Sequence, residues 1–458
     1  MANEVTHQRS QRVRRVKRLI SQPNARIRSL LRVLHPTEIA QVLEEAPSDL
    51  QKRIITRLPP DVISEAIAEM RDDAQPARLL TILHPSVAAG LIEALAPDDA
   101  ADLLAQIPEL SKEKILTYVP DEDEEELKLL LTYDEETAGG LMNPDVICVR
   151  ANMNKLEALR EVVQLSEEAE DFYTIYVTDD DDFLVGYITF KNLFKAQNSE
   201  LVGNIMSQEV IFVRVDDDQE EVAKVMSRYN LPTLPVVDPD KRLIGRVTFD
   251  DILDVIEEET TEDILNFVGV SEGATLRGDS VEAFKSRITW LLTNLITASI
   301  AATVIFNFQD TIEEIVIVAI FMPIIAGVAG NGANQTLGVT IRRIATEGIP
   351  TRKAFQVILK ELGVSVLNGL TIGTIVSLGA LGLAFYRDDL EVDLRIGLVV
   401  FLAMCGNLII GGLMGSFVPI TLERIGVDPA IASSILITAF TDVLGYLLLF
   451  GLATLILL

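Results

Sequence analysis

The sequence predicts a multi-domain membrane protein. An all-α superhelical N-terminal domain, a repeated α/β module and a connecting helix precede an α-helical membrane bundle of five spans. Three observations support this fold class. The 458 residues are too many for one compact core. A net charge of −29 coexists with a mean hydropathy of +0.30, which a single soluble domain rarely combines. A sequence pattern within the acidic N-terminal half occurs twice.

The charge and the hydropathy separate near residue 281. Residues 281–458 hold 10 Lys and Arg against 13 Asp and Glu, so the first 280 residues carry −26 of the net charge of −29. An acidic surface attracts cations and repels nucleic acid, which excludes a nucleic-acid partner. Two cysteines and three histidines provide no disulfide framework, zinc site or nucleophilic triad, so we expect no enzyme. The polar, basic N-terminus indicates no signal peptide.

The apolar half contains five segments, each long enough to cross the roughly 30 Å hydrocarbon layer as a helix. They are Ile288–Phe306, Ile315–Leu337, Ala354–Phe385, Ile396–Ile420 and Ala430–Leu458. Lys and Arg flank the first span and occupy the second-to-third and fourth-to-fifth loops, whereas the other two loops are acidic. The positive-inside rule therefore predicts a multi-pass protein of the plasma (inner) membrane, with a cytoplasmic N-terminus and Leu458 outside.

Asp442 lies well inside the fifth predicted span. A carboxylate at that depth costs about 2.5–3.5 kcal/mol on insertion scales, so it must face a partner or water. It is either a buried group hydrogen-bonded to a neighbouring helix or a carboxylate of an ion path. Mg²⁺, which keeps most of its waters, suits one or two such carboxylates.

The second predicted span ends in a stretch of small and amide residues. Four glycines between 327 and 338 accompany Asn331, Asn334 and Gln335. We expect this composition to disrupt the helix beside a water-filled cavity. Tight helix packing through small residues is the alternative.

The acidic half contains an internal repeat. LMNPDVICVR (141–150) matches IMSQEVIFVR (205–214), and VGYITFKNLF (185–194) matches IGRVTFDDIL (244–253). Each copy reads as strand, helix, strand, turn, strand and helix. The pattern resembles a tandem pair of cystathionine-β-synthase (CBS) domains. That resemblance implies possible nucleotide (ATP) binding, at Thr248 and Asp251.

Residues 25–130 have no strand pattern. Proline with acidic neighbours recurs at expected helix starts, and LHPTEIA (34–40) returns as LHPSVAA (83–89). This predicts an α-solenoid of short helix pairs. The basic run Arg9–Arg18 is either a solvated helix face or a contact with anionic lipid.

The connection to the membrane carries an acidic helix, DDILDVIEEETTEDILNFVGV (250–270). Residues 251, 254, 258 and 262 share one face by their spacing, with 259 and 263 beside them. The run is either a solvated acidic face or, packed against the acidic groups of the solenoid and the second CBS copy, a sensor of divalent cations.

This order of parts resembles the MgtE family of magnesium transporters over nearly the whole chain. The resemblance rests on LMNP (141–144), EEETTEDI (257–264), AGVAGNGANQ (326–335) and TDVLG (441–445). It implies a homodimer joined through the membrane and CBS domains, with membrane lipid around it and no protein substrate. It also implies a pore on the two-fold axis, closed by the connecting helix as a plug when cytosolic Mg²⁺ is high.

The resemblance also assigns residues. The ion-pore residues it implies are Asp442, Asn331 and Gly330. The regulatory Mg²⁺ residues it implies are Asp98, Asp102, Asp218, Glu220, Asp251, Asp254, Glu259, Glu262, Asp263 and Asp428. The chain departs from the family at AGNGANQ, where GGN-x-G-x-Q is commoner, and at Asn230, where some members carry an acid.

The domain boundaries we predict are 1–24 for a basic segment, 25–135 for the solenoid, 136–200 and 201–255 for the CBS domains, 250–280 for the connecting helix and 281–458 for the membrane domain. The function implied is import of Mg²⁺ gated by cytosolic Mg²⁺. The alternatives are a CBS-gated carrier of Mn²⁺, Co²⁺ or a proton-coupled substrate, and a membrane-tethered, nucleotide-regulated enzyme.

Overall fold

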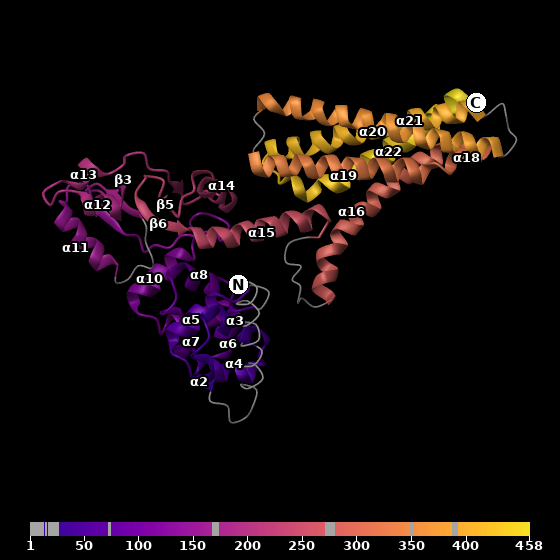
Figure 1. Cartoon of the computed structure of the whole chain (residues 1–458). Helices are drawn as coiled ribbons and strands as arrows, with labels where there is room; N and C mark the ends of the chain where they lie inside the picture. The colour runs from indigo at the N-terminus through magenta and orange to yellow at the C-terminus, as the bar shows by residue number, and fades with distance from the viewer. Residues whose placement is uncertain are drawn as a thin grey trace. The chain divides into compact units, whose positions relative to one another are not determined.

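The computed structural model describes residues 13, 16, 27–71, 75–166, 174–270, 280–347, 351–386 and 393–458. These residues form two compact units, Met1–Glu259 and Thr260–Leu458, so the boundary between the units falls inside one helix. Figure 1 traces the elements in chain order. The predicted basic run Arg9–Arg18 lies outside the described residues, apart from Val13 and Val16, which are both buried.

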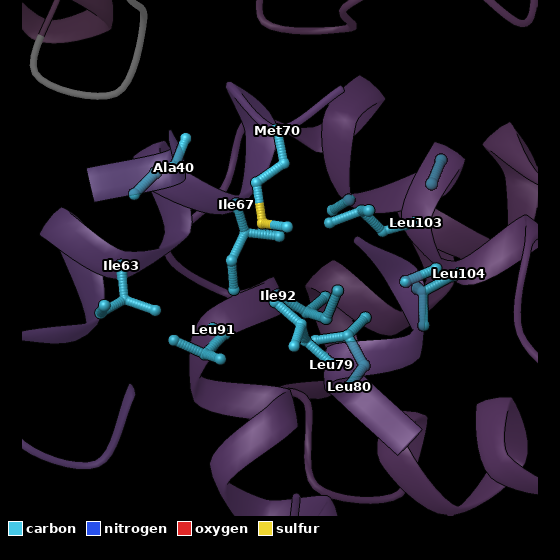
Figure 2. Close-up of a cluster of buried hydrophobic side chains, with 14 of the residues drawn as sticks. Ala40, Ile63, Ile67, Met70, Leu79, Leu80, Leu91, Ile92, Leu103 and Leu104 are labelled. Atoms are coloured by element: carbon cyan, nitrogen blue, oxygen red, sulfur yellow. The ribbon is translucent and has the colours of Figure 1, made fainter. Parts of the chain in front are cut away.

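The first unit begins with the predicted solenoid of short helices. They are α2 (Ile27–Leu31), α3 (Pro36–Glu45), α4 (Ser48–Ile55), α5 (Pro60–Ala68), α6 (Ala77–Ile82), α7 (Pro85–Ile92), α8 (Pro97–Ala105), α9 (Glu109–Leu116) and α10 (Asp121–Leu130). Helices two apart in the chain pack together: α3 on α5, α5 on α7, α7 on α9 and α8 on α10. Figure 2 shows aliphatic side chains from α3, α5, α6, α7 and α8 gathered in the core between them.

Proline sets where these helices start, as the sequence predicts. It is the first helical residue of α3, α5, α7 and α8, where its missing N–H leaves no helical hydrogen bond unmade. The histidine of each LHP repeat precedes such a proline. Nδ1 of His84 accepts a hydrogen bond from the backbone N–H of Ser86, and the backbone N–H of His35 donates to Glu38. Two of the three histidines therefore sit at helix N-termini.

The predicted repeat is confirmed as two small sheets of identical topology. The first contains β1 (Cys148–Arg150), β2 (Thr174–Thr178) and β3 (Leu184–Thr189), and the second β4 (Val213–Arg214), β5 (Thr233–Val237) and β6 (Leu243–Thr248). In each sheet the first pair is parallel and the second antiparallel, with a register shift after Val177 and at the equivalent Val236. The helices around them are α11 (Lys155–Leu165), α12 (Phe190–Lys195), α13 (Val202–Ile205) and α14 (Gln219–Tyr229).

The two copies contact each other through their central strands. The hydroxyl groups of Tyr176 and Thr233 are hydrogen-bonded at 2.9 Å in the interior, and burial raises the pKa of Tyr176 to about 12. The first copy has its own apolar core. The core of the second copy is continuous with that of the solenoid, which unites the first unit.

The predicted connecting helix is α15, which runs from Phe249 to Phe267 and is shorter than the predicted 250–280. The chain turns at Gly269, just after the end of α15. Gly269 has a φ of +74°, a value that glycine adopts without strain. Residues 271–279 lie outside the described residues. At its far end, Phe267 packs against the cluster of Ala333, Leu337 and Ile437 in the second unit.

Among its described residues, the second unit has five helices long and apolar enough to cross a membrane, as predicted. Its elements are α16 (Ser280–Asn307), α17 (Gln309–Glu314), α18 (Val316–Ala319), α19 (Met322–Glu347), α20 (Thr351–Tyr386), α21 (Asp393–Arg424) and α22 (Pro429–Leu457). Helix α21 packs against α19, α20 and α22 and is the most buried of the five.

The predicted disruption of the glycine-rich stretch was wrong, because α19 is an uninterrupted helix through residues 327–338. The break in the second span comes earlier, between α18 and α19. Packing against α21 explains the continuity. A Cβ on Gly332 would lie 2.9 Å from a methyl group of Leu408, and one on Gly415 would lie 2.6 Å from the carbonyl of Ala333. Small residues here allow close helix approach, which was the alternative reading.

Candidate functional site

The predicted pore residues lie on two neighbouring helices of the membrane unit. Gly330 on α19 is buried, and a Cβ added to it would lie 3.8 Å from the hydroxyl of Thr441, the residue before Asp442 on α22. Gly411 of α21 packs against the same two helices. A Cβ added to it would lie 3.1 Å from the carbonyl of Ala329 and 3.5 Å from the methyl group of Thr441. Glycines on α19 and α21 therefore let these two helices approach each other and the side chain of Thr441, which precedes Asp442.

The amides of the glycine-rich stretch differ in their surroundings. Asn331 and Gln335 are exposed on the second unit. The side-chain oxygen of Asn334 is buried and has no hydrogen-bond partner among the described residues. A buried amide oxygen without a hydrogen-bond donor lowers the stability of the fold. This cost favours a role for Asn334 in holding water or a hydrated ion over a role in helix packing alone.

Glu361 on α20 is a buried carboxylate within a candidate span, only 6% exposed, and the sequence analysis did not select it. Its backbone carbonyl lies 3.5 Å from where a Cβ of Gly412 on α21 would stand. Glu361 lies inside the predicted third span, Ala354–Phe385, next to Lys360. The signal that could have found it is the apolar sequence on both sides, which places the carboxylate within the helix.

The first carboxylate pair of the acidic unit is Asp98 and Asp251, which we call the solenoid–CBS pair. Asp98 lies in the first turn of α8, only 9% exposed, and accepts a 3.1 Å hydrogen bond from Nδ2 of Asn143. Burial, then the charges of Asp251 and Asp99, raise the pKa of Asp98 well above its ordinary value. Burial also raises the pKa of Asp251 to about 6. Two carboxylates predicted separately are therefore brought together, in surroundings that disfavour their charge.

The second group surrounds Glu259 on α15, and we call it the α14–α15 cluster. Oε1 of Glu259 accepts a 2.6 Å hydrogen bond from Nε2 of Gln219 on α14. Burial raises the pKa of Glu259, and the charges of Glu220, Asp218 and Glu136 raise it further. Asp218 caps α14 by accepting from the backbone N–H of Glu220 at 2.9 Å.

Glu136 belongs to this cluster although the sequence reading did not select it. Its backbone carbonyl accepts a 2.9 Å hydrogen bond from the N–H of Gln219, which fixes the segment before the first CBS copy against α14. The acidic run YDEE (133–136) was visible, but its proximity to α14 depends on tertiary packing.

The remaining predicted regulatory residues occupy helix positions adjacent to these groups. Asp102 follows Asp98 by one turn of α8, and Asp254 follows Asp251 on α15 and raises its pKa. In the second unit, Oε1 of Glu262 accepts a 3.1 Å hydrogen bond from Asn266, next to Asp263. Asp428 lies between α21 and α22.

Mg²⁺ fits this donor chemistry. The candidate regulatory ligands are all hard carboxylate oxygens, and Mg²⁺ keeps several waters while binding one or two carboxylates. In the described ranges, no group of three or more His, Cys, Asp or Glu side chains has metal-binding geometry. Pairs of carboxylates rather than closed cages suit a cation that retains its water. The Mg²⁺ itself would supply positive charge that offsets the repulsion within each group.

The predicted nucleotide positions are engaged with each other. The hydroxyl and the backbone N–H of Thr248 both donate to Oδ2 of Asp251, which caps α15. In the first copy, the hydroxyl of Thr189 accepts from the N–H of Asn192 in the equivalent turn. A ribose would have to compete with these bonds.

The raised pKa of Asp251 predicts a pH-dependent stability in Mg²⁺-free buffer containing EDTA. The carboxyl group of Asp251 binds its proton more firmly in the folded chain than in the unfolded chain. The protonated group therefore stabilises the folded chain fully below about pH 4, and this stabilisation is lost as pH rises through about 6. Asp251→Asn should therefore stabilise the first unit at pH 7 by on the order of 1–3 kcal/mol, with little effect at pH 4. Limited proteolysis across a temperature series measures this. Asp121→Asn on exposed α10 is the control, and an equal effect at both pH values would contradict the prediction.

Comparisons with known proteins agree with the arrangement of these parts. Family models match in chain order: the MgtE intracellular N domain over residues 23–136, the CBS domain over 138–199 and 202–258, and the MgtE divalent cation transporter over 322–452. The magnesium transporter MgtE of Thermus thermophilus is 36% identical, with 72% of each chain covered, and that of Bacillus subtilis is 30% identical, with 93% of each covered. A crystal structure of the soluble part of a magnesium transporter aligns with a TM-score of 0.50 and 30% identity, covering 55% of this chain and 99% of that one.

Proposed function

The chain belongs to the MgtE family of magnesium transporters, and on that premise we propose that it imports Mg²⁺ across the plasma membrane, under control of Mg²⁺ bound to its acidic half. Its five apolar helices form the transporting half. Similarity to transporters of Thermus and Bacillus supports Mg²⁺ as the substrate. The gating and the site residues rest on the geometry described above.

The observation that carries the proposal is the packing of Gly330 on α19 against Thr441 on α22, the residue before Asp442. A carboxylate inside a span marks an ion pathway by default. Gly330 lies next to the hydroxyl group of Thr441, and Gly411 lies next to the carbonyl of Ala329 and the methyl group of Thr441, so three helices meet at the residue before that carboxylate. Asp442 would hold the waters of a hydrated Mg²⁺, and Gly330 and Asn331 would line the narrow part.

Regulation would act through α15, which carries acidic groups of both units. Glu259 belongs to the α14–α15 cluster, whereas Glu262 and Asp263 lie beyond the unit boundary. The same helix ends in Phe267, which packs on residues of α19 and α22. A change in cation binding at the acidic end of α15 could therefore reach the helices that carry the pore residues.

The mechanism we favour is a shift between two populations. Cytosolic Mg²⁺ bound at the solenoid–CBS pair and the α14–α15 cluster stabilises a compact, closed form. When Mg²⁺ falls, repulsion among the carboxylates removes that support. Moving the balance from 1:99 to 99:1 takes about 5.5 kcal/mol of differential binding, which several ions can supply together.

Two further features belong to the proposal. The chain would act as a homodimer through its membrane and CBS domains, with the pore on the two-fold axis. ATP would bind the CBS pair only by displacing the bonds between Thr248 and Asp251. The homodimer and the binding of ATP are both carried over from the family resemblance.

Flux into liposomes tests the proposal. Purified protein should take up Mg²⁺ from the outside, and Mg²⁺ on the cytosolic face should slow that uptake. Competition with Mn²⁺ and Co²⁺ distinguishes Mg²⁺ selectivity from transport of another divalent cation. An absence of Mg²⁺ uptake under any condition would exclude the proposed function.

A further inference from the structure

Asn407 is a fully buried amide at the meeting of three membrane helices. It lies on α21, and its Nδ2 donates a 3.2 Å hydrogen bond to the carbonyl of Ile325 on α19. Its Oδ1 is buried and has no hydrogen-bond partner within the described residues. In the described part of the membrane unit, the one other buried side-chain atom in this condition is Oδ1 of Asn334.

Helix α22 is built to fit this amide. Gly445 of α22 faces it, and a Cβ on Gly445 would lie 2.4 Å from Nδ2 and 2.9 Å from Cγ of Asn407. No side chain could be added there without displacing one helix. The amide therefore touches the backbones of α19 and α22 at once.

The contact lies one helical turn from the candidate ion path. Gly445 follows Asp442 by three residues on α22, and Asn407 precedes Gly411 by four residues on α21. Gly411 is the residue that approaches both Ala329 and Thr441. A slide of α22 along α19 would move Asp442 and would also break the fit around Asn407.

Stability alone does not explain an asparagine at this position. A buried amide oxygen without a donor costs free energy, whereas leucine has the same branched shape and number of heavy atoms and leaves no polar atom unpaired. A buried asparagine that lowers stability can nevertheless fix the register of packed helices, as it does in coiled coils.

We propose that Asn407 is a positioning residue that fixes the register of α22 against α19 and so places the carboxylate of Asp442. The role rests on the proposed transport of Mg²⁺ and adds a residue to it. The hydrogen bond to Ile325 sets the position on α19, and the close fit to Gly445 sets it on α22.

Two variants of the full-length protein in liposomes test the role. Asn407→Leu removes the hydrogen bond, and Gly445→Ala inserts a methyl group into the fit while leaving Asn407 intact. Each should lower the maximal rate of Mg²⁺ uptake by roughly tenfold or more, since small displacements of a reacting group have effects of that size. The thermal unfolding temperature of Asn407→Leu in detergent should be unchanged or higher. A purely structural role predicts the opposite, a joint loss of stability and uptake, and that result would overturn the proposal.

The chain offers a matched control for each variant. Asn368→Leu changes an exposed amide of α20, and Gly451→Ala adds a methyl group to α22 where nothing lies within 4 Å. Both should transport at the rate of the unaltered protein. A loss in Gly451→Ala equal to that in Gly445→Ala would assign the effect to α22 in general and refute the specific fit.

A crosslink reads the register without reference to transport. Gly330→Cys and Thr441→Cys, in a protein carrying Cys148→Ser and Cys405→Ser, place two thiols on facing helices within disulfide reach. Oxidation should join them when Asn407 is present, and the yield should fall sharply with Asn407→Leu. An unchanged yield together with unchanged uptake would refute the role of Asn407. Failure of the unaltered protein to transport Mg²⁺ would instead count against the proposed function, and the crosslink would still report on the register.

Discussion

Asp442→Ala should lower Mg²⁺ uptake by roughly a hundredfold or more, because removing one partner of a charge pair away from bulk water costs on the order of 3–5 kcal/mol. Uptake into liposomes measures the loss. The protein should still fold, since Asp442 is half-buried and the helix around it is held by apolar contacts on α19 and α21.

Asp442→Asn separates the two readings of this residue. Asparagine has nearly the same volume and can still hydrogen-bond, so a structural carboxyl group would tolerate it. An ion-path carboxylate would not, because the amide carries no charge for a hydrated cation. Asp310→Ala in α17, outside the long helices, is the control. Wild-type uptake by Asp442→Asn would contradict the pore role.

The five spans and the repeated module could be predicted because their signals are local. An apolar run of span length and a strand–helix–strand order repeated after about 60 residues are both read along the chain. Helix starts in the solenoid were equally local, since proline marks them. The glycine-rich stretch misled because glycine lowers helix propensity, whereas packing of Gly332 against Leu408 holds the helix in the folded protein.

The candidate sites could be predicted only in part, because proximity depends on tertiary packing. Asp98 and Asp251 are 153 positions apart, and no local pattern indicates that they pair. Nothing local marks Glu136 as a neighbour of Glu259, or Asn407 as a neighbour of Gly445. Burial also changes the chemistry of these groups, since it is the main cause of the raised pKa values of Asp98, Asp251 and Glu259.

The substitution of Glu259→Gln, Glu262→Gln and Asp263→Asn together should leave cytosolic Mg²⁺ unable to close the pore. These residues lie within five positions of α15, on both sides of the boundary between the units. Neutral amides are poor ligands for Mg²⁺ compared with carboxylates, so the ion no longer stabilises the closed form over the open one. A ligand without differential affinity shifts no equilibrium. Patch recordings with stepped cytosolic Mg²⁺ should therefore show a conductance that stays open.

The loss of Mg²⁺-dependent closure should arise from the position of these carboxylates on α15, and not from the removal of three negative charges from the protein. Asp121→Asn, Glu122→Gln and Glu125→Gln remove the same three charges from exposed positions of α10 and serve as the control. That control should close at the Mg²⁺ concentration of the unaltered protein, because screening by salt makes exposed charges nearly independent. Normal closure of the α15 variant would contradict the sensor assignment while leaving transport through Asp442 intact. Failure of both variants to close would mean that total charge, and not the carboxylates of α15, sets the gate.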